Sequence, residues 1–195
     1  VLGTRLLCDK SVKQAGPMPD AETVIIDSGG HQVQPPGSPK RAGGAAKAIY
    51  KWIDIAEMDS FPPDVTQAVV AVGDAKYHNY DLGRHVIHAW GPDLRKMPDA
   101  WEDVVATLAD TYCNILREFA GSRLPAVRLL PVSGGIFAGQ YQKKMPELTM
   151  VALKLGFAQL TRAEQVAIIG KRIDLCIFLE AELEEFESVV RKSCS

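Results

Sequence analysis

The chain of 195 residues carries 22 Lys and Arg against 24 Asp and Glu, which gives a formal net charge of −2. A chain of this length buries about two-thirds of its unfolded surface, so we expect one domain over residues 1–195. The balanced charge excludes a general polyanion binder, unless basic residues gather locally.

The apolar runs and the cysteines exclude further classes. No apolar run approaches the ~20 residues of a membrane span, and no charged start followed by an apolar segment indicates a signal peptide. The cysteines, Cys8, Cys113, Cys176 and Cys194, are far apart, with no Cys-x-x-Cys pair and no histidine at metal-ligand spacing. We expect core thiols in a reducing, cytoplasmic compartment, no metal, no cofactor and no membrane partner. Because the chain begins at Val1, we also expect a module of a larger polypeptide.

Short β-branched and Leu-rich runs alternate with helical patterns, which favours an α/β domain over separate helical and sheet halves. Strands are expected at residues 4–8, 23–26, 75–80, 85–90, 126–130 and 173–178. Helices are expected at residues 44–56, 101–119, 146–159, 162–170 and 181–192. In the longest of these helices, apolar residues from Trp101 to Phe119 recur every three or four positions, which indicates one buried face.

Residues 28–41, SGGHQVQPPGSPKR, carry three prolines and three glycines between an expected strand and an expected helix. We call this segment the lip. Its composition is typical of a loop, and loops that leave a rigid scaffold often carry function. The sequence therefore predicts an inserted, mobile lip at the mouth of a ligand site.

A first glycine loop opens the helix expected at residue 44. It consists of Gly43, Gly44 and Ala45. Unpaired backbone N–H groups and the positive end of the helix dipole can receive a diphosphate there, and a side chain would hold the phosphate off. The alternative is a tight turn without a ligand.

A second glycine loop follows the strand expected at residues 126–130. It consists of Ser133, Gly134, Gly135, Ile136 and Phe137. These residues can complete a nest of backbone amides around a diphosphate, with Phe137 against a ribose. The alternative is a structural strand-to-helix turn. A hydrolase nucleophile at Ser133 is excluded, because the elbow motif requires Gly-x-Ser-x-Gly and Pro131 occupies the place of the first glycine.

Several blocks in order along the chain resemble the macro domain family, which binds ADP-ribose and related nucleotides. They are RLLCDKS at 5–11, TVIIDSGG at 23–30, GGAAKAIYKW at 43–52, GDAK at 73–76, GRHVIHAWGP at 83–92 and PVSGGIFAG at 131–139. The third block is similar to macro domains in replicase polyproteins of positive-strand RNA viruses. The resemblance implies a three-layer α/β/α sandwich around a mixed central sheet.

The resemblance also assigns parts of a ligand site. Asp9 would accept a hydrogen bond from the adenine amino group, with Lys10 beside it. Ser28, Gly29 and Gly30 would line the distal ribose, and the two glycine loops would hold the diphosphate. His88 matches the strand histidine of the family, for which a structural role is favoured over proton transfer.

The match departs from the family at the ribose. Gly30 stands where hydrolases and tight ADP-ribose binders usually carry an Asn, and Asp27 stands at the preceding Asn. A glycine cannot orient a hydroxyl or position a water. This leaves enzyme activity open, with His31 or Asp27 as the possible substitutes.

Three hypotheses follow from these residues. The first is a binding module for ADP-ribose, free or on an ADP-ribosylated protein, with weak or no catalysis. The second is an ADP-ribosyl hydrolase that removes ADP-ribose from proteins. The third is a divergent macro fold that has lost ADP-ribose and serves RNA binding or protein interaction, with a basic rim that includes Lys40 and Arg41. RNA binding at such a rim would weaken steeply with salt.

Overall fold

The computed structural model describes residues 3–4, 7–8, 21–81, 83–177 and 180–194. Its strands form a mixed sheet in the order β1-β7-β6-β3-β5-β4, with β2 also paired to β7. Only the β4–β5 pair is antiparallel among the described pairings. The strands are β1 (Gly3–Thr4), β2 (Leu7–Cys8), β3 (Thr23–Asp27), β4 (Ala75–Tyr80), β5 (Arg84–Ala89), β6 (Ala126–Leu129) and β7 (Arg172–Ile177).

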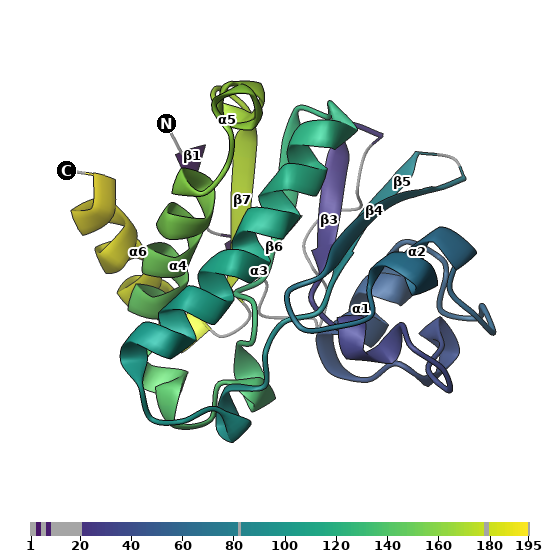
Figure 1. Cartoon of the computed structure of the whole chain (residues 1–195), viewed down its shortest axis with the longest axis horizontal. Helices are drawn as coiled ribbons and strands as arrows, with labels where there is room; N and C mark the ends of the chain where they lie inside the picture. The colour runs from purple at the N-terminus through teal and green to yellow at the C-terminus, as the bar shows by residue number, and fades with distance from the viewer. Residues whose placement is uncertain (1–2, 5–6, 9–20, 82, 178–179, 195) are drawn as a thin grey trace.

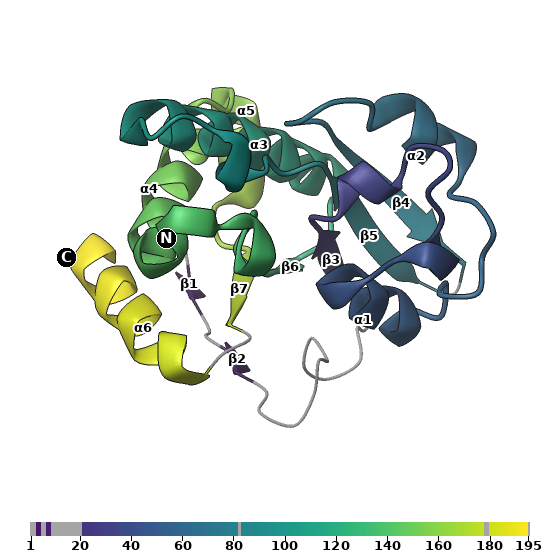
Figure 2. The same ribbon diagram turned by 90° about the horizontal axis from the view of Figure 1, so that it is seen from below.

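Helices cover both faces of this sheet. They are α1 (Gly44–Trp52), α2 (Pro63–Ala68), α3 (Trp101–Ser122), α4 (Met145–Ala158), α5 (Arg162–Ile168) and α6 (Glu180–Cys194). Figure 1 shows α1 and α2 beside β4 and β5, and Figure 2 shows α3 and α1 on opposite sides of the sheet. No helix in the described ranges is long and apolar enough to cross a membrane.

The alternation of side chains along β3 separates two cores. Val24 and Ile26 pack with the buried faces of α3, α4 and α6. Ile25, between them, points to the other face and packs with α1 and α2. Successive side chains of a strand point to opposite faces, so one five-residue strand contributes to both layers. This confirms the predicted α/β/α sandwich.

All the strands predicted within the described residues are present, and the helix boundaries differ in detail. The first helix ends at Trp52 rather than near residue 56, since Asp54 adopts a left-handed φ of 57° and turns the chain. The longest helix ends at Ser122, because the next residue, Arg123, adopts a left-handed φ of 62°. The prediction missed α2, which has six residues and begins with proline.

The expected core thiols are present at Cys113 and Cys176, which are both buried and free. Burial raises the pKa of the Cys176 thiol to about 12. A thiol with so high a pKa is mostly protonated at neutral pH and therefore a poor nucleophile.

The helices α3 and α4 approach each other closely at Gly156. A Cβ atom at this position would lie 2.6 Å from the carbonyl oxygen of Ala109 and 2.8 Å from the backbone nitrogen of Cys113. A methyl group therefore cannot be accommodated without moving the two backbones apart. The packing of the larger core depends on this glycine.

We predict that Gly156→Ala lowers the free energy of unfolding by roughly 1–3 kcal/mol, as expected for overpacking. Urea denaturation measures the change. Gly121→Ala is the matched control, because Gly121 lies in α3 with no atom within 4 Å of the added Cβ. Helix propensity predicts that the control gains up to about 1 kcal/mol. Equal effects of the two substitutions would contradict this account of the helix contact.

Candidate functional site

The candidate site lies where the neighbouring parallel strands β3, β5 and β6 end. The carboxyl ends of parallel strands share one edge of a sheet, which is where α/β domains bind ligands. The lip and the first glycine loop follow β3, and the second glycine loop follows β6. The topology therefore brings together two predicted loops that are about ninety residues apart in the sequence.

The first glycine loop forms an uncapped helix start. Gly43 is the N-cap of α1, with no side-chain hydrogen bond to the cap and no acidic residue in the first turn. Gly43, Gly44 and Ala45 are all exposed. A Cβ atom added at Gly43 or Gly44 would meet no atom within 4 Å, and Gly44 adopts φ 55°. The positive end of α1 is thus accessible to an anion.

The second glycine loop is anchored at its start and open at its tip. The buried Ser133 adopts φ 60° and donates a hydrogen bond from Oγ to the carbonyl oxygen of Pro92 at 2.5 Å. Gly135 adopts φ 63°, and a Cβ atom there would meet no atom within 4 Å. Ile136 is 76% exposed at the tip. The Ser133 side chain therefore holds the start of the loop against the segment that follows β5. Gly134 and Gly135 form the turn.

An aromatic contact joins the lip to the second glycine loop. The rings of His31 and Phe137 meet edge to face with their centroids 5.4 Å apart. The guanidinium of Arg95 lies over the same phenyl ring, 5.0 Å from its centroid. Asp93 holds Arg95 through two hydrogen bonds of 2.7 Å, and this contact lowers the pKa of the Asp93 carboxyl to about 2. The lip and the second glycine loop are therefore in direct contact through His31 and Phe137.

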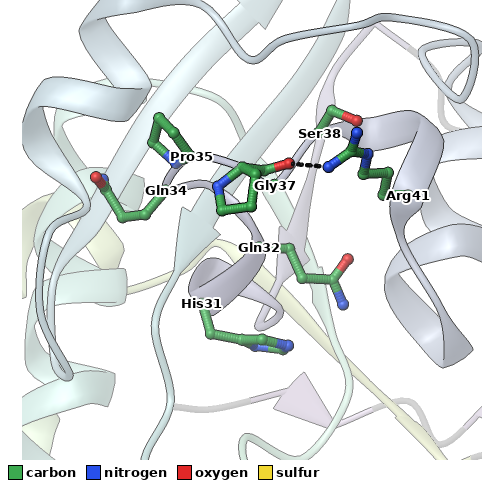
Figure 3. A pocket seen from close by; sticks show the side chains of 8 residues that line it. His31, Gln32, Gln34, Pro35, Gly37, Ser38 and Arg41 are labelled. Carbon is green, nitrogen blue, oxygen red and sulfur yellow. Dashed lines mark hydrogen bonds between the residues drawn. The ribbon is translucent and has the colours of Figure 1, made fainter.

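The lip is packed against the protein, in contrast to the mobile segment that its composition favoured. Gln34 Nε2 donates to the carbonyl oxygens of Thr66 and Val69 at 2.8 Å and 2.5 Å. Val33 and Ser38 are buried. The lip lines an open hollow of about 350 Å³, which Figure 3 shows from close by. The sequence could not predict this anchoring, because every residue has a backbone carbonyl and nothing marks those of Thr66 and Val69 as the partners of Gln34.

A buried hydrogen-bonded cluster lies beneath the site. Asp27, at the end of β3, accepts hydrogen bonds at Oδ2 from the Tyr50 hydroxyl of α1 and from His88 Nδ1 of β5, the latter at 2.8 Å. Its Oδ1 accepts from the backbone N–H of Gly29 at 3.0 Å. The Tyr80 hydroxyl of β4 lies 2.9 Å from His88 Nε2. Asp27, Tyr50 and His88 are completely buried.

The carboxylate of Asp27 can only accept, so the His88 nitrogen that contacts it, Nδ1, carries a proton. The other ring nitrogen, Nε2, pairs with the Tyr80 hydroxyl. Burial and then the Asp27 charge raise the pKa of Tyr50 well above its ordinary value. Burial and the same carboxylate also raise the pKa of Tyr80. Both phenols therefore remain protonated at neutral pH, and His88 is buried between Asp27 and Tyr80.

The segment 28–30 packs so closely against the strand end that Gly30 has no room for a side chain. A Cβ atom at Gly30 would lie 2.6 Å from the carbonyl oxygen of Ala89 and 2.7 Å from the Cα of Trp90. Gly29 forms an antiparallel bridge to Trp90, which holds the segment against β5. Ser28 and Gly29 are half-buried beside it. The glycine that departs from the family pattern is thus required by close packing.

Two other predicted residues cannot be placed in this site. Asp9 and Lys10 lie outside the described residues. The sequence analysis did not identify Tyr50 as a partner of Asp27 or Tyr80 as a partner of His88. Tyr50 lies in the block GGAAKAIYKW at 43–52. Within the described parts of the chain, no group of three or more His, Cys, Asp or Glu side chains could hold a metal ion.

The fold is that of macro domains, as the comparisons with known proteins show. No protein-family model matches the sequence, and no curated protein sequence matches it. Solved structures do match. The Oceanobacillus iheyensis macrodomain with ADP is 19% identical over 90% of this chain and 86% of that one, with a TM-score of 0.58. The Trypanosoma brucei macrodomain in complex with ADP-ribose is 16% identical over 87% and 63%, with a TM-score of 0.56.

A viral structure also matches. A chain described as alphavirus P23pro-zbd is 20% identical, with a TM-score of 0.65 over 100% of this chain. The present chain spans 24% of its length. At these identities the matches establish the fold, and the chain has the macro domain fold.

We predict that Asp27→Asn destabilises the protein by about 2–3 kcal/mol. The Asn amide would turn an N–H group toward one of the three donors and leave buried groups unpaired. Urea denaturation measures the loss. Tyr50→Phe, which removes one donor and leaves two, is expected to cost less. An Asp27→Asn variant as stable as the wild type would contradict the proton arrangement above.

We further predict that Gly30→Asn, which introduces the usual family residue, destabilises the fold by roughly 1–3 kcal/mol or more because of overpacking. Thermal unfolding checks this. Gly73→Asn is a control at an open position, where the added Cβ meets no atom but φ is 95°. A Gly30→Asn variant with an unchanged midpoint of thermal unfolding would show that the segment 28–30 can accommodate a side chain.

Proposed function

We propose that this domain binds ADP-ribose, either free or attached to a protein, with the diphosphate held between the two glycine loops. The observation that carries the proposal is the open backbone at both loops. Gly43, Gly44 and Gly135 each have free space where a Cβ atom would stand, and they lie at the same edge of the sheet. Backbone N–H groups in such a setting suit a group with delocalised negative charge.

The structural neighbours support this ligand. The Oceanobacillus iheyensis macrodomain is described with ADP and the Trypanosoma brucei macrodomain with ADP-ribose. The alphavirus match supports a second part of the proposal, that the domain is one module of a larger polypeptide such as a viral replicase. A reducing cytoplasmic compartment suits the buried free thiols of Cys113 and Cys176.

Binding with weak or no hydrolysis is favoured over an ADP-ribosyl hydrolase. Water must be held by a side chain at the distal ribose for general acid–base chemistry. Gly30 offers none, and the Asp27 carboxylate is buried and accepts from three donors. His31 is the remaining polar candidate, and its ring packs on Phe137.

RNA binding at the lip is the weaker alternative. Lys40 lies 3.5 Å from Asp59, so part of the basic rim is neutralised. Exposed ion pairs of this kind also weaken the attraction of a surface for polyanions.

Isothermal titration calorimetry with ADP-ribose, AMP and a short oligo(A), at low and moderate salt, tests the proposal. We expect ADP-ribose to bind in the micromolar range with little salt dependence, because its contacts lie in a defined site. Binding of oligo(A) alone, falling steeply with salt, would contradict the proposal and establish RNA binding instead.

Gly44→Glu tests the position of the diphosphate. We expect it to weaken ADP-ribose binding by about a hundredfold or more, because like charges brought together cost several kcal/mol. Gly170→Glu is the matched control. Gly170 also has a positive φ and open space, but it precedes β7 at the opposite edge of the sheet. Equal binding by the two variants would show that the diphosphate does not lie at α1.

A further inference from the structure

Strand β4 forms one edge of the sheet (Figure 1). The strand order ends with β3-β5-β4, so β5 is the one neighbour of β4 among the described strands. An edge strand presents backbone N–H and C=O groups that can pair with a strand of another molecule. The outward groups of β4 therefore decide whether two molecules can associate through their sheets.

The pairing with β5 determines which backbone groups of β4 face outward. Just before the strand, the N–H of Trp90 donates to the carbonyl oxygen of Asp74 at 2.9 Å, so these two residues form a hydrogen-bonded pair. Hydrogen-bonded and non-hydrogen-bonded pairs alternate along an antiparallel ladder. The register of β4 with β5 continues directly from this pair. The backbones of Ala75, Tyr77 and Asn79 therefore point away from β5.

Two side chains of α3 reach this outer edge. Glu118 Oε2 accepts a hydrogen bond from the backbone N–H of Tyr77 at 2.8 Å. Asn114 Nδ2 donates to the carbonyl oxygen of Gly73, in the turn before β4, at 2.9 Å. Arg117 Nη1 donates to Asn114 Oδ1, which fixes the orientation of that amide. Residues four apart lie on one face of a helix, so α3 supplies partners for one donor and one acceptor along the edge.

We propose that Asn114 and Glu118 hold the β4 edge closed against pairing with β4 of a second copy of this chain. Two such edges are identical and can pair antiparallel about a two-fold axis. A pairing strand needs the N–H of Tyr77, which lies in the middle of the outward row. It would have to displace the half-buried Glu118 carboxylate and leave that charge without its donor, which is unfavourable. The domain therefore stays monomeric although its sheet ends in an edge strand.

Removing the Glu118 carboxylate tests this inference. We expect Glu118→Ala to self-associate with a dimer dissociation constant at least about tenfold lower than that of the wild type, because one hydrogen bond to a charged group no longer opposes pairing. Sedimentation equilibrium over a range of protein concentrations measures the difference. Glu118→Gln should remain monomeric, since its amide oxygen still accepts from Tyr77. Glu102→Ala is the matched control for charge, because Glu102 is an exposed carboxylate in the first turn of the same helix.

A second substitution separates strand pairing from general aggregation. Asn79 is exposed on the outer edge of β4. Asn79→Pro removes an outward N–H and leaves the hydrogen bonds to β5 in place, since proline is tolerated on edge strands. We expect the double variant, Glu118→Ala with Asn79→Pro, to return to the monomer. Aggregation caused by a loss of stability would not be reversed in this way.

The inference is overturned if Glu118→Ala is as monomeric as the wild type, if Glu102→Ala associates equally, or if the double variant associates as strongly as Glu118→Ala. A wild-type dimer that Asn79→Pro dissociates would also overturn it, since the edge would then be paired already. These outcomes are independent of the proposed function, because neither α3 nor β4 contributes to the glycine loops.

Discussion

The buried carboxylate of Asp27 is the interaction on which the site depends. It connects the end of β3 to α1 through Tyr50, to β5 through His88 and to the following loop through Gly29. Removing a charge from water is costly unless hydrogen bonds replace the solvent. Three donors do so here, and Tyr80 extends the cluster to β4. The need to satisfy this one charge fixes where the chain leaves the sheet and therefore where the lip begins.

Much of the fold could be predicted from the sequence, because its signals are local. β-branched runs gave the strands within a residue or two, and the three- and four-residue spacing from Trp101 gave α3. The same local signals could not show that Asp27 is buried. An aspartate after an apolar strand usually caps a turn, and its partners Tyr50 and His88 lie 23 and 61 residues away in the sequence.

The backbone conformation of the candidate site could be predicted from its glycines. Glycines at the start of a helix and after a strand predict exposed N–H groups, and the structure places both loops at one edge of the sheet. The contacts between side chains were not predictable. Nothing in the sequence indicates that His31 reaches Phe137 or that Gln34 holds the lip against α2, since these contacts depend on how the lip folds. The positions of Asp9 and Lys10 remain a prediction from the resemblance.

Close packing at Gly30 constrains the segment 28–30 and leaves the two glycine loops unaffected. The segment 28–30 lies against Ala89 and Trp90, and that contact leaves no space for a Cβ atom. The glycine loops do not depend on it, because their N–H groups belong to the backbone of other segments. The lip places the His31 ring against Phe137 of the second glycine loop. Because Gln34 bonds the carbonyl oxygens of Thr66 and Val69, the lip holds His31 in a defined position rather than on a free loop.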